Sequence, residues 1–448
     1  MQLRKHCLVA FVAYSAIVIT VLAQYSTPDG GAANRVGNPF FNTLQYVNPI
    51  YAANVNKSVA LYSNNATRVA LLQVVATYPT FVWLSSFSAI STILAHLSNA
   101  ANQSNGRPIV VPFVIYNIPG MLSKACRDCS ALASPGQIPP GALDQYKAQF
   151  IDPILTLFAT KQSNINLVLI IEPDALPDVI AYNCASATTY PAAIAYAIAK
   201  FSTLANTTIY LDAGNGPWLG VPGLRGKIAP MYQSVMTLAK AINPKASIRG
   251  YSSNLSNYNP FEGRGLCPAK QYCPLVDGAY NGNECIDENI FTQTMNTAFA
   301  SAGLPTRWLI DTSRSGQIGV RTYWSSWCNI RGAGLGERAI SNPASQVDAF
   351  VWVKPPGNSD GASNGTSGID PHCVPTDPLG VDALGGAPSA GAWFDAHFVM
   401  LVDNASPAKF VASVIRQASA STHTTKASSY VWQVANLPLI LLLNKLIL

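Results

Sequence analysis

Short apolar runs alternate along the chain with longer segments in which apolar residues return every three or four positions. The runs are rich in Val, Ile, Tyr and Phe, and they are continuous rather than alternating, which is typical of strands that are buried on both faces. Seven strands are therefore predicted, over residues 81–84, 109–116, 166–171, 207–211, 247–251, 307–310 and 349–353.

Two of the intervening segments show helical spacing of their apolar residues. Because strands and helices alternate, the chain is predicted to form an α/β fold with a parallel sheet, either closed or open. The residues that carry the helical spacing are Leu143, Tyr146, Phe150, Ile154, Leu155 and Phe158 in one segment, and Ile228, Met231, Tyr232, Val235, Leu238 and Ile242 in the other.

Polar or aromatic residues follow the predicted strands at their carboxyl ends. In a β/α barrel these ends converge at one mouth, where catalytic groups collect. A single Asp in such a place could merely cap the next helix, but the recurrence at nearly every strand favours a site. The residues are Trp83, Tyr116, Asp128, Glu172, Asp174, Asp212, Trp218, Asn254, Asp311, Arg314, Lys354 and Asp360.

The composition narrows the class of protein. Of 448 residues, 49% are hydrophobic and only 11% are charged, which excludes a solvated coiled coil and wholesale disorder. The formal net charge is +6, and Arg4, Lys5, Lys426 and Lys445 near the two ends account for four of these charges. The middle of the chain therefore has no basic patch that would indicate a nucleic-acid partner.

The two ends have the features of targeting signals. Residues 1–23 combine a basic start, an apolar stretch and a small-residue cleavage site, as in a secretory signal peptide. An uncleaved anchor helix is the alternative, but no stop-transfer charges follow this short run. Residues 430–448 are apolar and follow a segment rich in Ser, Thr and Ala at 406–429, which fits a glycosylphosphatidylinositol signal or, equally, a sticky extension. We expect a secreted or cell-surface protein with a linker at 24–40 and one compact domain at 41–405.

The cysteines indicate disulfide bonds and not a metal site. Cys7 leaves with the signal peptide, and an even set of eight remains, as expected of a secreted chain. Cys126 and Cys129 lack a second pair with which to bind zinc, and the histidines are scattered, so no metal or cofactor is expected. Sequons for N-glycosylation occur at Asn56, Asn65, Asn102, Asn206, Asn254, Asn364 and Asn404.

Carboxylates without metal ligands or a thiol nucleophile suggest acid–base hydrolysis. An indole ring beside them suits a sugar, because a pyranose presents C–H groups to an aromatic face and hydroxyls to its rim. Splitting a glycosidic bond needs a carboxylic acid to protonate the leaving oxygen, and a carboxylate that either attacks or deprotonates water. The residue types at the strand ends therefore predict a glycoside hydrolase.

Residues 169–176, with the sequence LIIEPDAL, resemble the signature of glycoside hydrolase family six, whose members are cellobiohydrolases and endoglucanases that act on β-1,4-glucan. The resemblance implies a distorted, roughly seven-stranded parallel β/α barrel of the TIM type and hydrolysis with inversion of the anomeric configuration. It makes cellulose the expected partner of a chain that we expect to be a monomer. Further matching segments follow in the family's order at 127–134, 210–214, 254–259, 313–316, 327–329, 351–355 and 390–394.

The resemblance also implies catalytic roles. Asp174 is the general acid, and Asp128 helps to keep the pKa of Asp174 high. Asp360 is the candidate base, although a chain of waters could take the proton instead. Tyr116 and Ser134 lie near the distorted sugar and the water, and Arg127 and Arg314 are charge partners of this region, a role compatible with plain structural salt bridges.

Substrate contacts and disulfides follow from the same resemblance. Trp83, Trp218 and Trp327 match sugar platforms, whereas Trp308 and Trp393 are interpreted as core residues. Lys354 and Asn254 match hydrogen-bonding positions, while Ser85, Asn215, Asn358 and Val221 stand where the family commonly has Asp, His, Glu and a distal Trp. The implied disulfides are Cys129–Cys184 and Cys328–Cys373, and the pairing of Cys126, Cys267, Cys273 and Cys285 stays open.

The mode of attack depends on loop length. The segment 354–391 looks full length, and in this family a long loop there helps to roof a tunnel, which favours a cellobiohydrolase over an open-cleft endoglucanase. A catalytically impaired glucan-binding protein is the rival from another class, because the loop at 120–126 is longer than usual and could misplace Asp128. A retaining β-glucanase would need two neighbouring Glu residues, and only Glu172 ends a strand.

Overall fold

The computed structural model describes residues 37–120, 128, 131–132, 134, 136–182, 186–262, 283–364 and 369–405. The chain divides after Ser406 into two units, and all described residues belong to the first. The predicted signal peptide, the 406–429 linker and the apolar tail therefore lie outside the described residues, as does most of the predicted 24–40 linker.

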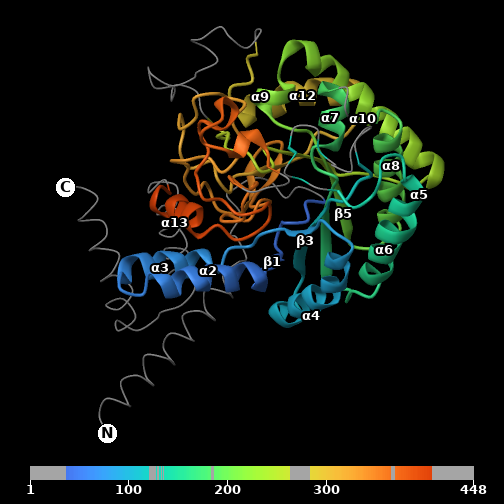
Figure 1. Ribbon diagram of the computed structural model, residues 1–448. Coiled ribbons are helices and arrows are strands. Elements are labelled where there is room, and N and C mark those ends of the chain that lie inside the picture. Colours follow the sequence, from blue (N-terminus) through green and yellow to red (C-terminus); the bar gives the residue numbers. More distant parts are fainter. Residues whose placement is uncertain are drawn as a thin grey trace. The chain divides into compact units, whose positions relative to one another are not determined.

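A mostly parallel sheet runs through the described part of the chain, as Figure 1 shows. Its strand order is β1-β3-β4-β5-β6-β7-β9-β8, and β2 pairs in parallel with β3. Only β8 runs antiparallel to its neighbour. The strands are β1 (Leu44–Gln45), β2 (Val82–Leu84), β3 (Ile109–Ile115), β4 (Ile165–Ile171), β5 (Thr207–Asp212), β6 (Gly250–Ser253), β7 (Trp308–Asp311), β8 (Ile340–Ala344) and β9 (Val347–Val351).

The seven predicted strands are confirmed as β2 to β7 and β9, with two corrections. The strand predicted at 349–353 runs over Val347–Val351. The segment predicted at 247–251 begins only at Gly250 and runs on to Ser253. At Gly250 a Cβ atom would lie 2.0 Å from the carbonyl oxygen of Arg307, so the close approach of β6 and β7 requires glycine there. The sequence pattern did not reveal β1 or β8, because β1 has two residues and β8 contains Asn342 and Pro343.

The sheet is curled into a distorted barrel, as the sequence predicts. Alternate side chains of the strands fill its interior, among them Val110, Val168 and Leu309, while the others pack against helices. A backbone hydrogen bond of 3.1 Å from the N–H of Phe81 to the carbonyl oxygen of Trp352 joins the segments that flank β2 and β9. Because both faces are covered, the strands read as continuous apolar runs.

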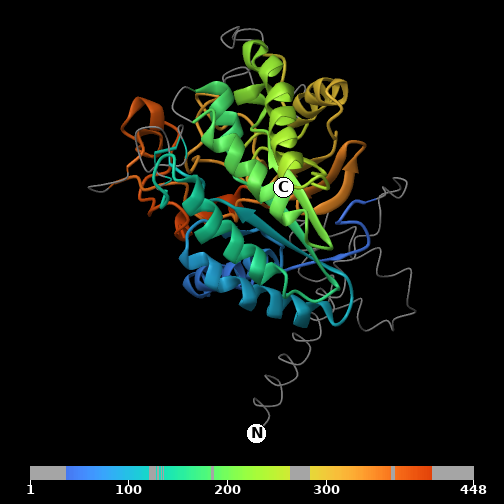
Figure 2. The ribbon, with the colours of Figure 1, turned by 90° about the vertical axis from the view of Figure 1, so that its right-hand side faces the viewer.

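Helices cover the outer face of the strands (Figure 1), and α8 and α10 run side by side in Figure 2. The first predicted helical segment forms α5, a π-helical turn η2 and α6, and the second forms α10. Leu238 and Ile242 lie in α10 as predicted, on its exposed side, at 42% and 52% exposure. The helices are α2 (Pro49–Leu61), α3 (Ala66–Val75), α4 (Ile93–Ser104), α5 (Leu143–Gln145), η2 (Tyr146–Ile151), α6 (Asp152–Phe158), α7 (Ala175–Ala181), α8 (Thr189–Phe201), α9 (Gly216–Leu219), α10 (Pro222–Ile242), α12 (Glu288–Ser301) and α13 (Asp395–Asp403), with short 3₁₀ turns η1 (Ser88–Thr92), η3 (Pro371–Cys373) and η4 (Pro378–Gly380).

The two tryptophans that were interpreted as core residues do pack inside the protein. Trp308 is buried against Tyr251 and Phe299. Trp393 is half-buried against Tyr51 and Phe398. Among the described helices, none is long and apolar enough to cross a lipid bilayer.

Candidate active site

A cavity of about 620 Å³ opens at the carboxyl ends of the strands. Its wall is built largely from the loops that follow β2, β3, β4, β5, β6, β7 and β9, which is where a β/α barrel places its site. The structure brings together most of the residues that the sequence predicts for the site. Those that line the cavity are Trp83, Ser85, Tyr116, Asp128, Ser134, Asp174, Asn215, Trp218, Trp327, Lys354, Asn358 and Asp360.

Asp174 reaches the cavity because the chain turns sharply after β4. Glu172 and Asp174 both adopt left-handed backbone conformations, with φ of 43° and 68°. The turn sends the Glu172 carboxylate away from the cavity, where it accepts bonds from the backbone N–H groups of Asn117 and Ile118 and from the hydroxyl of Tyr146. Glu172 therefore supports the loop after β3, and Asp174 alone of this pair faces the cavity.

The surroundings of Asp174 favour its protonated form. Burial raises the pKa of Asp174 well above its ordinary value, and the neighbouring charges of Asp128 and Asp212 raise it further, against a smaller opposing effect of Lys354. The Asp174 carboxyl makes no hydrogen bond to any side chain or backbone group that the structure describes. It is thus a carboxylic acid that can give its proton to a group entering the cavity.

Asp212 lies directly behind Asp174 and did not figure among the predicted catalytic residues. Its Oδ2 accepts a hydrogen bond of 3.0 Å from the backbone N–H of Asp174. Burial raises the pKa of Asp212 to about 7, although several backbone N–H groups and Ser252 donate to it and act in the other direction. Its signals in the sequence were its place at the end of β5 and its position within the matching segment 210–214.

Asp128 belongs to the loop that follows β3 and lines the cavity. It is 3% exposed, and its Oδ1 accepts a hydrogen bond of 3.0 Å from the backbone N–H of Ala131. Ser134 in the same loop accepts a hydrogen bond of 3.2 Å from the hydroxyl of Tyr116. The loop thus presents a carboxylate and two hydroxyls to one part of the cavity.

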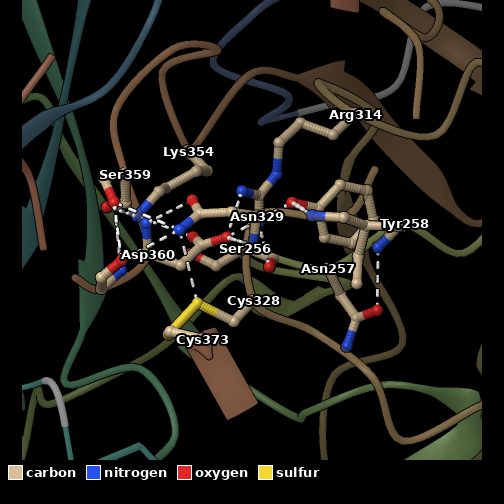
Figure 3. A network of polar contacts seen from close by, with 12 residues as sticks. Ser256, Asn257, Tyr258, Arg314, Cys328, Asn329, Lys354, Ser359, Asp360 and Cys373 are labelled. Atoms are coloured by element: carbon tan, nitrogen blue, oxygen red, sulfur yellow. Dashed lines mark hydrogen bonds and ion pairs between the residues drawn. A yellow bond between two sulfur atoms is a disulfide. The ribbon is translucent and has the colours of Figure 1, made fainter. Parts of the chain in front are cut away.

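Asp360 stands in a cage of donors, which Figure 3 shows from close by. Arg314 Nη1 lies 2.7 Å from Oδ2, and Lys354 Nζ lies 3.0 Å from Oδ1. The backbone N–H of Asn329 and the hydroxyl of Tyr258 also donate to Oδ2, at 2.8 and 3.3 Å. Burial alone would raise the pKa of Asp360, but the two cations outweigh it and hold the pKa well below its ordinary value. Asp360 is therefore a permanently ionised carboxylate and a weak base.

Arg314 takes its predicted place as the partner of Asp360, but it lies behind the cavity wall. It is only 1% exposed, and its guanidinium carbon lies 4.2 Å from the centre of the Tyr258 ring. Its Nη2 donates to the backbone carbonyl of Ser256. Asn329 and Tyr258 were not predicted, because their contacts with Asp360 join residues far apart in the chain.

Three tryptophans offer partly exposed indole faces to the cavity. Trp83 is fixed by a hydrogen bond of 2.8 Å from its Nε1 to the carbonyl of Val353 and by an edge contact with Tyr116. Trp327 lies against the ring of His372, with 5.6 Å between ring centres. Flat apolar faces beside polar rims are suited to sugar rings.

Trp218 and Asn215 belong to the loop after β5. The Oδ1 of Asn215 accepts a hydrogen bond of 3.1 Å from the backbone N–H of Trp218 and so caps α9. Behind this loop lies Glu288, a buried carboxyl that accepts bonds from the backbone of Gly216, from Ser253 and from Asn259. Burial raises the pKa of Glu288 to about 7. The sequence analysis missed Glu288, which joins the loops after β5 and β6.

Asn254 requires a correction. It was predicted to contact substrate, but it is fully buried and does not line the cavity. Its side-chain amide donates to the carbonyls of Asn259 and Asp311, and its Oδ1 accepts from the backbone of Asn259. With φ of 66°, Asn254 shapes the turn after β6 rather than a sugar site.

One of the two predicted disulfides, Cys328–Cys373, is confirmed. Cys129, Cys184 and Arg127 lie outside the described residues, as do Cys126, Cys267 and Cys273. Cys285 is a buried thiol whose pKa burial raises to about 11. Within the described ranges, no group of three or more His, Cys, Asp or Glu side chains is placed to hold a metal ion.

Comparisons with known proteins agree on one family. A profile described as glycosyl hydrolases family 6 matches residues 40–405. The 1,4-beta-D-glucan cellobiohydrolase C of Emericella nidulans is 35% identical over 391 residues, which cover 84% of this chain and 80% of the relative. Among solved structures, CcCel6C from Coprinopsis cinerea has a TM-score of 0.74 at 32% identity, covering 83% of this chain and 98% of that chain. Endoglucanase CEL6B from Humicola insolens has a TM-score of 0.68 at 31% identity, covering 82% and 98%.

Proposed function

Because this chain belongs to glycosyl hydrolase family 6, we propose that it hydrolyses the β-1,4-glucosidic bonds of cellulose with inversion and releases cellobiose. The observation that carries the proposal is the acid at position 174. Its carboxyl faces a cavity flanked by indole rings, and burial together with neighbouring carboxylates favours its protonated form. Such a group can protonate a glycosidic oxygen at neutral pH.

In the proposed reaction, sugar rings lie on Trp83 and Trp218 with the scissile bond beside Asp174. The carboxyl of Asp174 gives its proton to the bridging oxygen as the bond from that oxygen to the anomeric carbon breaks. A water molecule adds to the opposite face of the same carbon, which inverts its configuration. Asp128 stabilises the positive charge that develops on the sugar.

The water must lose a proton, and Asp360 is the proposed acceptor, directly or through other waters. Its carboxylate is ionised at every pH at which Asp174 can act. Arg314 and Lys354 make Asp360 a weak base, so the proton is expected to pass on quickly to solvent. Proton transfer through a chain of water molecules fits this weak basicity better than a long-lived protonated Asp360.

The packing of segment 354–391 supports a cellobiohydrolase. Residues from both ends of the segment, including Pro355, Asn358 and Gly391, line the cavity. The two ends are joined by a bond of 2.9 Å from the backbone N–H of Gly391 to the carbonyl of Ser359. We infer that this segment roofs the cavity, which favours attack at chain ends, while the similarity to an endoglucanase keeps an open-cleft enzyme as the second candidate.

The test is incubation of the purified protein with phosphoric-acid-swollen cellulose. We expect cellobiose as the main soluble product, with the α-anomer formed first when the reaction is followed by NMR. Mixed longer products with a rapid fall in viscosity would favour the endoglucanase instead. Binding of glucan without any released sugar would mean a catalytically impaired glucan-binding protein.

A variant of the acid sharpens this test. Asp174→Asn should lower kcat/KM for cellotetraose by a factor of order 10³, because the leaving sugar needs the proton. On β-cellobiosyl fluoride the loss should be far smaller, since fluoride departs with little protonation. Equal losses on the two substrates would contradict the assignment of Asp174 as the acid.

We propose in addition that the chain is secreted, with residues 1–23 as the signal peptide and residues 41–405 as the catalytic domain. The apolar residues 430–448 then act as a glycosylphosphatidylinositol signal that follows the 406–429 linker. Release of activity from intact cells by a phosphatidylinositol-specific phospholipase would support the anchor. Activity found only in the medium, with residues 430–448 intact, would contradict it.

A further inference from the structure

Tyr182 is an aromatic residue of the cavity wall to which no role has yet been assigned. It directly follows α7, the short helix that begins beside Asp174, and its backbone N–H donates to the carbonyl of Asp178 at 2.8 Å. It is 42% exposed and lines the same cavity as Asp174 and Trp218. A large aromatic side chain that keeps this exposure at the cavity rim is available to a bound ligand.

The ring of Tyr182 lies against the indole of Trp218. Their centres are 6.0 Å apart, and their planes are inclined by 34°. The indole N–H of Trp218 is buried and acts on the Tyr182 hydroxyl, whose pKa it lowers. The two rings thus form a shallow corner rather than one flat shelf, with the face of Trp218 as its floor and Tyr182 as its side.

The carboxylates of Asp178, Asp128 and Asp174 lie near enough to the hydroxyl of Tyr182 to affect its pKa. Burial first, and then the charges of Asp178, Asp128 and Asp174, raise the pKa of this phenol to about 12. The hydroxyl therefore keeps its proton throughout the working pH range and can donate a hydrogen bond to a sugar oxygen.

The position of this corner relative to the scissile bond follows from strand order. Trp83 follows β2, Asp128 and Tyr116 follow β3, Asp174 follows β4, and Trp218 follows β5. In the proposed reaction the distorted sugar lies beside Tyr116 and Asp128. The corner on the other side of Asp174 then holds the sugar that leaves.

We propose that Tyr182 and Trp218 together bind a sugar of the leaving chain, and that Tyr182 is a specificity-determining residue for that sugar. The inference rests on the proposed function and deepens it. Tyr182 lines the same cavity as Asn215, which stands where the family commonly has a longer His side chain. Val221, which stands where the family can have a distal Trp, does not line the cavity.

The experiment compares Tyr182→Ala and Tyr182→Phe on two substrates. Cellotetraose places sugars in the corner, whereas β-cellobiosyl fluoride fills only the Trp83 side and leaves the corner empty. Tyr182→Ala should lower kcat/KM for cellotetraose by about tenfold, mainly through KM, and change the value for the fluoride by less than about twofold. Tyr182→Phe should lie between, because it removes only the hydroxyl.

Tyr323 provides a matched control, since it is 51% exposed and does not line the cavity. Tyr323→Ala should leave both substrates unchanged. An equal loss on both substrates for Tyr182→Ala would overturn the inference, because the residue would then act on the acid and not on the leaving sugar. Unchanged kinetics on both would overturn it as well.

A binding measurement distinguishes a failure of this inference from a failure of the proposed function. If the wild-type protein hydrolyses neither substrate, the proposed function fails, and cellotetraose binding is then measured by calorimetry. A Kd that rises about tenfold in Tyr182→Ala still supports the corner. An unchanged Kd contradicts it.

Discussion

The backbone N–H of Asp174 donates a hydrogen bond of 3.0 Å to the side-chain carboxylate of Asp212. The bond ties the turn that carries the proposed acid to the end of the neighbouring strand β5. It also places a second buried carboxyl so close that its charge opposes the ionisation of the first. The same contact therefore fixes both the position and the acidity of Asp174.

Asp212→Asn should shift the pH dependence of activity. The amide oxygen of Asn can still accept the Asp174 N–H, but the negative charge is gone, so the pKa of Asp174 falls. The acid is then lost at lower pH, and the alkaline limb of kcat/KM should move down by about one pH unit. The measurement is the pH profile of cellotetraose hydrolysis. Asp377→Asn, remote from the cavity, is the control, and an unmoved or upward-shifted alkaline limb would contradict the assignment.

Asp360→Asn should destabilise the fold strongly. The substitution leaves Arg314 and Lys354, both largely buried, without the charge that holds them together. Breaking a buried ion pair by removing one partner costs about 3–5 kcal/mol of unfolding free energy. Urea denaturation measures this loss.

A solvent-exposed ion pair supplies the comparison for Asp360. Arg68 and Asp403 lie 2.6 Å apart with side-chain exposures of 29% and 41%. Asp403→Asn should cost no more than about 1 kcal/mol, because water screens and replaces the contact. Similar losses of unfolding free energy for the two variants would mean that the buried ion pairs of Asp360 are not the source of the effect.

Stability should fall as the pH rises from about 4.5 to about 7. Burial raises the pKa of Glu288 from 4.5 to about 7 in the folded state, so the unfolded chain releases this proton first. The contribution of Glu288 is fully present below about 4.5 and is lost as the pH approaches 7, by on the order of 3 kcal/mol. The melting temperature measured across this range reports the change.

Glu288→Gln separates this residue from other titrating groups. The variant keeps the bonding shape but cannot ionise, so its melting temperature should vary less between pH 4.5 and 7 than that of the wild type. Asp212 and Asp174, whose pKa values are also raised, should supply much of the remaining slope. An equally steep decline in Glu288→Gln would show that Glu288 is not responsible.

Loss of the disulfide between Cys328 and Cys373 should lower both stability and substrate affinity. The bond closes a loop with a sequence separation of 45, and removing such a constraint costs about 4 kcal/mol in the chain-entropy model. Each cysteine also follows one member of the Trp327–His372 ring pair, so the platform should loosen and KM should rise. The double variant Cys328→Ser with Cys373→Ser, studied in urea and on cellotetraose, tests both expectations. A loss below about 1 kcal/mol would contradict the first of them.

The strands and the cavity-lining residues were predictable because their signals are local. A strand buried on both faces is a continuous apolar run, and the residue after it lies at the mouth of the barrel, as Asp174 does. The edge strand β8 was not predicted, because Asn342, with φ of 50°, and Pro343 interrupt its apolar pattern. Sequence pattern could not reveal that the side chain of Asn254 points into the turn.

The support around the site was not predictable for a different reason. Tyr258 and Asp360 are 102 positions apart, and Asn329 reaches Asp360 across 31 positions. Such pairs become neighbours only after several strands have assembled. Glu288 begins a helix, where a carboxylate is ordinary, so nothing in the sequence marked it as the link between two loops.

At Asp174, thermal stability and catalytic turnover make opposite demands on the residue type. A non-glycine residue in the left-handed conformation that Asp174 adopts costs about 1 kcal/mol, and the buried carboxyl adds a desolvation penalty. A glycine there would relieve both and would leave no proton to donate. Any library of variants ranked only by survival on heating should therefore enrich chains that have lost the ability to cut cellulose.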